Sequence, residues 1–443
     1  MLTCHGISMA TSGFLIPQLE DPLLGFGITT DEGSWIASIT VFGSISGSLL
    51  GGLQCGKLGR RKSLLIDCHL FMLGTFLMAI SQGLSLLLAG RFIVGHAASS
   101  AVVAAPIFTS EISQPKVRKY TALFPLACVY VGIAVAYIFG ALLPWRTAIL
   151  ITFVVPAISF VLLFASPESA TWLISQSKED EAKLALTRLR GEDNMDIVVE
   201  EFQRILANKV LSEEESPKLK DLLVDPTFVK PIGFLLAFYT IGIQLCGSPI
   251  ISFYKVPLLL EADIQMDPYI AAAWLAAYRG VLTILALPFV GRFHKRTTLF
   301  CCGCLLSAGL LLLSSFTYFF VHEVDNYPEV KWIPIISILL IYTSHSFGWE
   351  SSIFSFRGEL LPAKGRSLGS SIIGFVSYLV AFTVIKLVPK TFEMLGVHGT
   401  FMISTGFVIC ELVLSFFCMP DTSELTLEAI EDMYRPRIDE NQE

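Results

Sequence analysis

Charged residues are scarce in this chain of 443 amino acids: 16% are charged, 53% are hydrophobic and the mean hydropathy is +0.65. Soluble domains carry about 25% charged residues, so the composition excludes an ordinary soluble protein and indicates a membrane protein. The net charge of −7 identifies no charged partner, because the acidic residues lie mainly in polar segments, and no nucleic-acid partner is expected. The first apolar stretch lacks a basic leading region, so no cleavable signal peptide is expected.

Other absences argue against enzyme chemistry. No nucleophile with a base and an orienting group is visible, and no cluster of metal-ligating residues, so neither a catalytic site nor a cofactor is expected. The 10 Cys lie mostly in or beside apolar segments, and we expect free thiols packed between helices. Asn occurs only at 194, 208, 326 and 441, outside every apolar segment. This is unexpected for a polyol transporter, because polar side chains must replace the hydrogen bonds to water that the solute loses.

Long apolar segments fill most of the chain. A membrane span needs about 20 mostly apolar residues. Twelve candidates are predicted, at 1–18, 34–55, 63–83, 88–110, 120–142, 146–165, 229–254, 268–290, 298–321, 332–357, 367–389 and 398–418. In the first, only residues 1–16 precede Pro17, and polar Thr3, His5 and Ser8 lie among them. This span is therefore expected to be clipped where it enters the membrane, as by a late start codon or in a short isoform. The pattern predicts an all-α membrane protein.

The loops between these spans differ in charge. Lys and Arg crowd into alternate loops, and the positive-inside rule places those loops and both termini in the cytoplasm. The polar segment 166–228 is expected to form short amphipathic helices on the same side, the first over 178–190 with Leu184, Leu186 and Leu189 apolar. The predicted domains are a six-helix bundle at 1–165, this cytosolic linker at 166–228, a second six-helix bundle at 229–419 and a cytosolic tail at 420–443.

One charged pattern occurs in both halves, at the ends of apolar segments. In the first half it comprises Gly56-Lys-Leu-Gly-Arg-Arg-Lys62, then Glu111 with Arg118 seven residues later, then Pro167-Glu168-Ser169. In the second half it comprises Gly291-Arg-Phe-His-Lys-Arg296, then Glu359 with Arg366 seven residues later, then Pro420-Asp421-Thr422. A duplicated bundle of membrane helices with charged groups on one face is typical of a transporter.

With these motifs, the chain resembles the sugar porter branch of the major facilitator superfamily, and within it the insect facilitated trehalose and hexose transporters. The resemblance covers nearly the whole chain and rests also on Gly90–Gly95, Leu123–Leu126, Pro167–Leu173, Gln244–Gly247 and Pro420–Leu427. It implies two pseudo-symmetric six-helix bundles that rock around a site at the membrane midplane.

The resemblance also implies a cytoplasmic latch that holds one state of the transporter and breaks when the inner gate opens. The residues that match it are Arg60, Arg61, Glu111, Arg118, Glu168, Arg292, Glu359 and Arg366. The acids that usually open the two loop motifs are replaced by Gly56 and Gly291, so this latch has lost two carboxylates. The alternative is a static staple between loops, which would not respond to the transport cycle.

The chain departs from the family at the expected solute site. In the seventh helix the family pattern Gln-Gln-x-x-Gly-x-Asn reads Ile243, Gln244, Gly247 and Pro249, and other sugar-facing positions align with Leu126, Phe354 and Ala381. The remaining candidates to line the solute cavity are polar-tipped, charged or aromatic: Gln244, Tyr254, Arg279, Trp349, Phe354, Ser377 and Tyr378.

Two charges stand out inside the predicted spans. Arg279 lies near the middle of the eighth span, where the family has an Asn that touches sugar, and Glu350 lies in the tenth, one turn after His345. Charge inside a membrane costs a few kcal/mol or more unless it is paired or hydrated, so by default it marks a pathway. Arg279 is expected either to pair with Glu350 and staple two helices or to face the substrate. Arg357 is expected at the cytoplasmic end, as part of the latch.

The predicted function is facilitative transport of trehalose or a hexose across the plasma membrane by alternating access, and the chain is expected to act as a monomer in the bilayer. Proton symporters of the family carry an acid in the first helix that faces an Arg in the fourth; here Arg91 is present, but no acid precedes Glu20. Two alternatives remain open: a porter for a different, anionic small solute matched to Arg279, and a transport-dead sugar sensor. Convergent hydroxyl and amide groups would favour a sugar, an unpaired Arg an anion, and a filled cavity the sensor.

Overall fold

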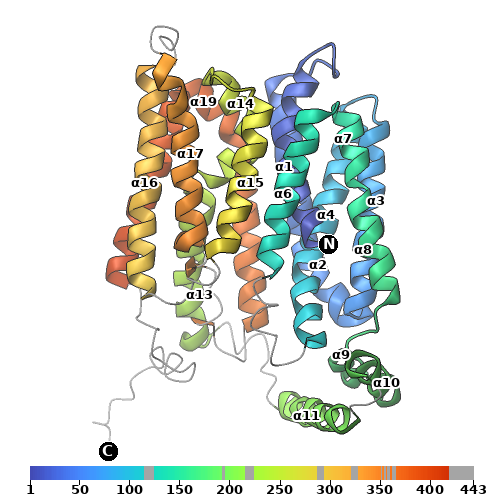
Figure 1. Ribbon diagram of the computed structural model, residues 1–443. Coiled ribbons are helices and arrows are strands. Elements are labelled where there is room, and N and C mark those ends of the chain that lie inside the picture. The colour runs from blue at the N-terminus through green and yellow to red at the C-terminus, as the bar shows by residue number, and fades with distance from the viewer. Residues whose placement is uncertain are drawn as a thin grey trace, which may run out of the picture.

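The structure is a computed structural model that describes residues 1–113, 124–191, 195–214, 224–286, 294–320, 328–350, 352–353, 356, 360–361 and 366–418. Within these ranges the chain forms helices and no strand, and the helices of the two halves stand side by side as two bundles (Figure 1). Ten helical stretches in the described part of the chain are long and apolar enough to cross a membrane. The predicted all-α membrane fold is therefore confirmed.

The first bundle contains seven labelled helices. They are α1 (Leu2–Glu20), α2 (Thr30–Leu58), α3 (Arg60–Ile80), α4 (Leu84–Ile112), α6 (Phe124–Leu142), α7 (Trp145–Thr152) and α8 (Val154–Ala165). α2 begins with a capping box, in which Thr29 and Glu32 each accept a backbone N–H of the other. α1 continues through Pro17 to Glu20 and is mostly buried among its neighbours. The ammonium group of Met1 lies part-way along this bundle and donates to Ser159 Oγ at 3.2 Å (Figure 1).

Small residues allow α2 and α4 to approach closely. A Cβ atom on Gly43 would lie 2.2 Å from Phe92 O, and one on Gly47 would lie 2.2 Å from His96 O. Gly95 presents the same close contact from the other helix, with Thr40 O at 2.0 Å from its would-be Cβ. Membrane helices gain little from hydrophobic association, so backbone contact through small residues is a main source of their packing energy.

The second bundle contains helices that are broken more often. They are α13 (Pro226–Tyr239), η2 (Thr240–Leu245), α14 (Ser248–Glu261), α15 (Pro268–Ala286), α16 (Lys295–Phe319), η4 (Pro328–Trp332), α17 (Ile333–Ser344), η5 (His345–Trp349) and α19 (Arg366–Cys418). α19 is divided by Gly396, which has a φ of +70°. η2 and η5 are π-helical turns, and the indole of Trp349 in η5 donates to Gly242 O in η2 at 2.7 Å. Because α14 continues the seventh span, that span extends to Glu261, further than the predicted end at 254.

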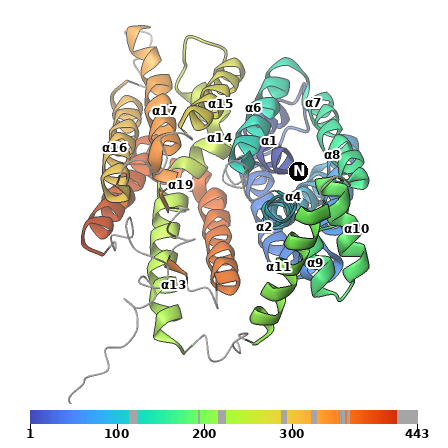
Figure 2. The same ribbon diagram turned by 60° about the horizontal axis from the view of Figure 1, so that its bottom comes forward.

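Three linker helices lie beneath the first bundle (Figure 2), and they define what we call the linker end of the molecule; the opposite end is the far end. The linker helices are α9 (Ala170–Ser175), α10 (Glu179–Arg190) and α11 (Met195–Glu214). α10 agrees with the helix expected over 178–190, but Leu184 is 55% exposed, so its assignment to the apolar face was wrong. The buried face is formed by Ala182, Ala185 and Leu186, because α10 is rotated by its contacts with α9 and α11.

Candidate solute site and latch

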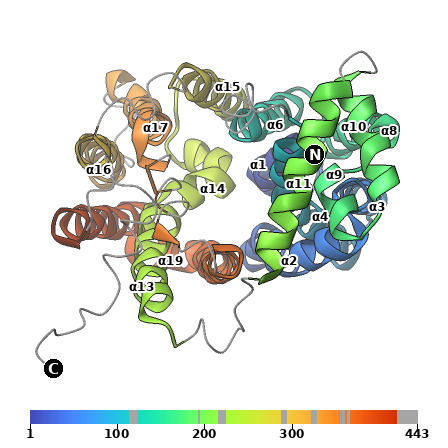
Figure 3. The same ribbon diagram turned by 90° about the horizontal axis from the view of Figure 1, so that it is seen from below.

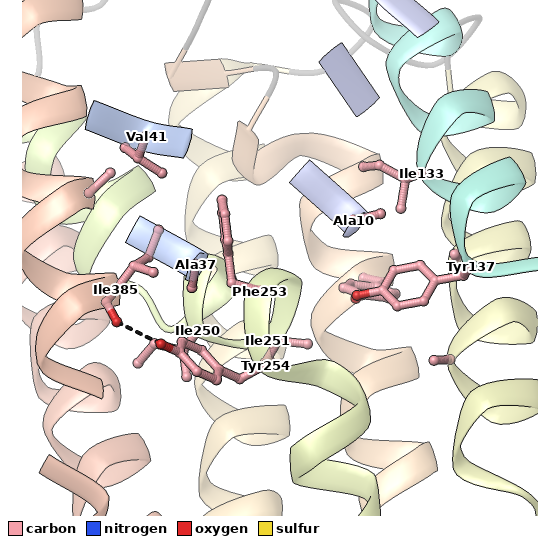
Figure 4. Packing of buried hydrophobic residues seen from close by; sticks show 14 of the residues in the cluster. Ala10, Ala37, Val41, Ile133, Tyr137, Ile250, Ile251, Phe253, Tyr254 and Ile385 are labelled. Carbon is pink, nitrogen blue, oxygen red and sulfur yellow. Dashed lines mark hydrogen bonds between the residues drawn. The ribbon is translucent and has the colours of Figure 1, made fainter. Parts of the chain in front are cut away.

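The two bundles meet through buried apolar side chains. Ala10, Ala37 and Ile133 of the first bundle pack in one cluster with Ile250 and Ile251 of the second (Figure 4). Seen from the linker end, helices α2 and α6 of the first bundle lie next to α19 and α15 of the second (Figure 3). The solute path of a two-bundle transporter would run along this interface.

Polar contacts tie the bundles together at the far end. Lys386 Nζ in α19 donates to Asp31 Oδ1 at 2.8 Å and to Ser34 Oγ at 2.7 Å, both in α2. Tyr137 OH in α6 donates to Ser252 O in α14 at 3.0 Å. These bonds cross between bundles rather than within one, so they must break if the far end opens.

Arg279 in α15 and Glu350, which directly follows η5, form an ion pair. Arg279 Nη2 lies 3.1 Å from Glu350 Oε2, and the two side chains are 8% and 18% exposed. Tyr130 of the first bundle joins the pair: its hydroxyl donates to Glu350 Oε2 at 2.6 Å and lies 2.8 Å from Arg279 Nη2. The guanidinium also lies over two rings, with Cζ at 4.6 Å from the centroid of Tyr130 and 4.8 Å from that of Tyr342. Of the two expected roles, the structure realises the ion pair.

A second buried cation, Lys255, lies on α14 between the two bundles. Its Nζ is 4.2 Å from the ring centroid of Tyr137 and 5.2 Å from that of Tyr342, and the residue is 1% exposed. Tyr342 therefore lies between Lys255 and Arg279. Sequence reasoning missed Lys255 because the seventh span was ended at residue 254, which placed this lysine at the membrane surface.

The other predicted cavity residues lie in different surroundings. Tyr254 is 5% exposed and donates to Ile385 O at 3.0 Å (Figure 4). Trp349 is completely buried between η2 and α16, inside the second bundle. Ser377 is 4% exposed, and its hydroxyl has no hydrogen-bond partner among the described residues. Gln244 and Tyr378 are half-buried, and Phe354 lies outside the described residues.

A pocket of about 360 Å³ opens between the bundles at the far end. Both bundles line it, and its polar or aromatic side chains are Glu20, Thr30, Tyr254, Glu261, Phe392 and Glu393. The volume falls in the range of small-molecule sites, about 300–1,000 Å³. Of the predicted solute residues, the structure brings Tyr254 to this pocket and Arg279 to the ion pair with Glu350.

Arg91 in α4 is buried against neutral oxygen atoms. Its guanidinium donates to Ile36 O and Ser8 O, each at 3.2 Å, and to Ser12 Oγ. Ser8 and Ser12 lie on α1, the helix on which a proton symporter of this fold would carry its acid. Hydroxyl and carbonyl groups occupy that place here.

The described members of the predicted latch form one cluster at the linker end of the first bundle. Arg60 donates to both carboxylate oxygens of Glu111, from Nε and Nη2, each at 3.0 Å. Ser169 Oγ donates to the same carboxylate. Glu168 Oε1 accepts the backbone N–H groups of Arg60 and Arg61 at 3.0 Å each, so this carboxylate caps the N-terminus of α3. Arg61 caps the C-terminus of α8 by donating to Leu163 O and Phe164 O at 2.9 and 2.6 Å.

The remaining predicted latch residues are not placed in the same way. Arg118, Arg292 and Glu359 lie outside the described residues, as does Arg357. Arg366 is described by its backbone only, where α19 begins at the linker end (Figure 1). The latch therefore stays a prediction, built on a first-half cluster whose geometry is known.

Two buried acids were missed by sequence reasoning. Asp67 in α3 accepts from Ser100 Oγ at 3.0 Å and from Gln54 Nε2 at 3.4 Å. Glu411 in α19 is completely buried, and neither of its carboxylate oxygens has a hydrogen-bond partner among the described residues. Both carboxylates lie within predicted spans or their extensions, and the rule that intramembrane charge marks function would have selected them.

Comparison with known proteins gives consistent results. A family model described as "Sugar (and other) transporter" matches residues 18–434. The chain is 27% identical over 431 residues to facilitated trehalose transporter Tret1 of Apis mellifera ligustica, covering 96% of this chain and 84% of that protein. It is 25% identical over 433 residues to Tret1 of Drosophila erecta, covering 98% of this chain but half of that protein's length.

Solved structures show the same fold. The inward open conformation of the xylose transporter XylE from E. coli superposes with a TM-score of 0.79 at 17% identity, covering 98% of this chain and 97% of that one. The XylE structure bound to 6-bromo-6-deoxy-D-glucose gives a TM-score of 0.75 at 16% identity, covering 98% of each chain.

Proposed function

Because the chain belongs to the sugar (and other) transporter family, we propose that it is a facilitative sugar transporter that works by alternating access. The observation that carries the proposal is the interface between the bundles, where contacts such as Lys386 to Asp31 can break without disturbing the core of either bundle. Rocking of two bundles around a midplane site needs such an interface. Trehalose and hexoses are the proposed solutes, since the relatives of this chain are named for trehalose.

The surroundings of Arg91 support facilitated diffusion over proton coupling. A proton-coupled cycle needs a group that gains and loses a proton between states. The α1 groups that face Arg91 are Ser8 O and Ser12 Oγ, and neither titrates near neutral pH. The solute gradient alone would then drive transport.

We further propose that residues 1–165 and 229–419 move as units, joined by the linker 166–228 and followed by the tail 420–443, with the linker and the tail in the cytoplasm and the working form a monomer in the plasma membrane. The solute would contact residues from the set Gln244, Tyr254, Arg279, Phe354, Ser377 and Tyr378, without Trp349, which is buried inside the second bundle. The latch at the linker end would comprise Arg60, Arg61, Glu111, Arg118, Glu168, Arg292, Glu359 and Arg366.

Uptake by proteoliposomes tests the proposal. The purified full chain is reconstituted and given labelled trehalose or glucose, with and without an imposed pH gradient. We expect at least one sugar to enter until its internal and external concentrations are equal, at a rate that the pH gradient does not change. Accumulation above the external concentration under a pH gradient would contradict facilitated diffusion. A folded, reconstituted protein that carries neither sugar would contradict this choice of solutes.

A further inference from the structure

Lys255 is a buried amine that has no carboxylate of the described residues beside it. It is 1% exposed, and the charge that acts on it most directly within the described chain is that of Arg279, which is also positive. Glu350, the nearby acid, is engaged by Arg279 and Tyr130. Lys255 in its protonated form would therefore add a positive charge that no remaining carboxylate of the described residues offsets.

The aromatic rings around Lys255 do not compensate for its burial. A desolvated cation–π contact contributes about 2 kcal/mol. The effective penalty for removing an ammonium ion from water is several kcal/mol. The contacts at 4.2 Å with Tyr137 and 5.2 Å with Tyr342 therefore orient the amine but leave most of the penalty. A negatively charged group on a ligand would remove this penalty by pairing with the protonated amine.

Neighbouring donors share this lack of acceptors. Arg279 Nε has no hydrogen-bond partner among the described residues, although the other end of its guanidinium is paired. Both ring nitrogens of His345, which is 3% exposed and within electrostatic reach of Arg279, also have none in the described chain. Buried polar groups are normally hydrogen-bonded, so an unmatched guanidinium N–H and an unpartnered imidazole indicate that a polar group is missing beside them.

We infer that Lys255 binds a carboxylate on the transported solute, so that the preferred substrate is an acidic sugar of the hexuronate type. The inference rests on the proposed sugar transport and narrows its substrate class. The carboxylate would accept hydrogen bonds from the Lys255 amine, and the rings of Tyr137 and Tyr342 would contact the apolar faces of the pyranose. The position between the two bundles makes the site accessible when they part.

Glucose and glucuronate test the inference because they differ only at C6, which carries a hydroxyl in one and a carboxylate in the other. Initial uptake of each labelled compound is measured in proteoliposomes with the wild type, Lys255→Met, Lys255→Arg and the control Lys331→Met. Lys331 is a far-end lysine of the same bundle that pairs with Asp263 at 2.7 Å. We expect the wild type and Lys331→Met to prefer glucuronate by about tenfold or more, the worth of one charge-assisted hydrogen bond. Lys255→Met should lose this preference but keep glucose uptake, and Lys255→Arg should retain it.

Thermal stabilisation of the detergent-purified protein by glucuronate provides a second measurement that does not require transport. Stabilisation by glucuronate but not glucose, lost in Lys255→Met, supports the inference even if no uptake is seen. Glucose uptake equal to that of glucuronate, unchanged in Lys255→Met, overturns the inference and leaves the proposed sugar transport intact. If no sugar crosses and glucuronate does not stabilise the wild type, both proposals are wrong.

Discussion

At the scale of single residues, the fate of a charge in the membrane depends on its partner. Arg279 is tolerated near the middle of the bundle interface because Glu350 lies 3.1 Å away and Tyr130 bonds to both. The attraction in such a pair roughly offsets the cost of removing both charges from water, so the pair adds little net stability. Removing one partner is different, because the other charge stays buried and uncompensated.

Glu350→Gln should therefore destabilise the protein by about 3 kcal/mol, near the low end for a broken buried pair because Glu350 keeps 18% exposure. The double variant Arg279→Met with Glu350→Leu should be closer to the wild type, since no lone charge remains. Unfolding in detergent, monitored as the loss of monodisperse protein, measures the stability of the single and the double variant. The control is Lys178→Met, which breaks an exposed pair with Glu181 and should change stability by less than about 1 kcal/mol. A Glu350→Gln variant as stable as the wild type would count against a structural role for the pair.

At the scale of helices, the corner between α2 and α3 is built by one glycine and one carboxylate. Gly59 has a φ of +99°, a conformation that residues with a side chain rarely adopt. A Cβ atom there would lie 2.5 Å from Glu168 Oε2, the carboxylate that caps α3. The tight corner is thus what allows Arg60 to reach Glu111 and the start of α9 to pack beneath it.

Gly59→Ala should destabilise the protein by about 1–3 kcal/mol, because it combines backbone strain with a steric clash. Gly56→Ala is the matched control three residues earlier. Gly56 lies in the last turn of α2 with nothing within 4 Å of its would-be Cβ, so the substitution should be neutral or stabilising by up to about 1 kcal/mol. Thermal unfolding of both variants distinguishes the two glycines; equal effects would show that the corner is not tightly specified.

Glu111→Ala should slow sugar uptake several-fold while folded protein still reaches the membrane. The carboxylate collects Arg60 and Ser169 at the linker end, but the Arg60–Glu111 pair is partly hydrated, with side chains 18% and 14% exposed. Pairs of this kind bias the equilibrium between two states more than they hold a fold. Arg366→Ala should behave in the same way, and Glu181→Ala, on the exposed surface of the linker, is the control. Wild-type uptake in Glu111→Ala at equal expression would reject a latch role for this residue.

At the scale of the whole molecule, the structure is closed at the far end by contacts between the bundles. Lys386 bridges to Asp31 and Ser34, and the ring of Phe382 lies 6.5 Å from that of Trp35 and 5.5 Å from that of Phe42. Elsewhere the bundles meet through buried apolar side chains and through Tyr130, which bonds to Glu350, so the far-end contacts are one part of the interface. A small change in these contacts should therefore shift the balance between far-end closed and far-end open states.

Asp31→Asn should increase the population that is open at the far end, because it removes the charge that Lys386 contacts. The measurement is the distance between spin labels at Leu23 and Met394, exposed far-end positions of different bundles, after replacement of the exposed Cys301, Cys304 and Cys410. We expect a longer distance to gain population. Asp263→Asn, which breaks the Lys331 pair inside the second bundle, is the control and should leave the distribution unchanged. Identical distributions for Asp31→Asn and the wild type would show that this contact does not hold the far end closed.

Several features could be predicted from the sequence because they depend on local spacing. Apolar runs long enough to span a membrane predicted the helical fold, and the i, i+4 pattern predicted α10 to within a residue at its start. The motif around Arg60 and Glu111 predicted charged groups that meet at one end of a bundle. The face of α10 was predicted incorrectly at Leu184, because which side of a helix is buried depends on the neighbours it meets.

The sequence by itself determined that this is a membrane protein of two related halves, since hydropathy and motif order are properties of the chain alone. Only the tertiary structure decided which intramembrane charges are neutralised. Glu350 reaches Arg279 across 71 residues of sequence, whereas Lys255, on a helix seven residues longer than the predicted span at that end, is buried between two rings with no acid of the described chain beside it. The cause is geometric, because the depth and rotation of a helix are set by its packing against its neighbours, and these decide which distant side chains come within reach.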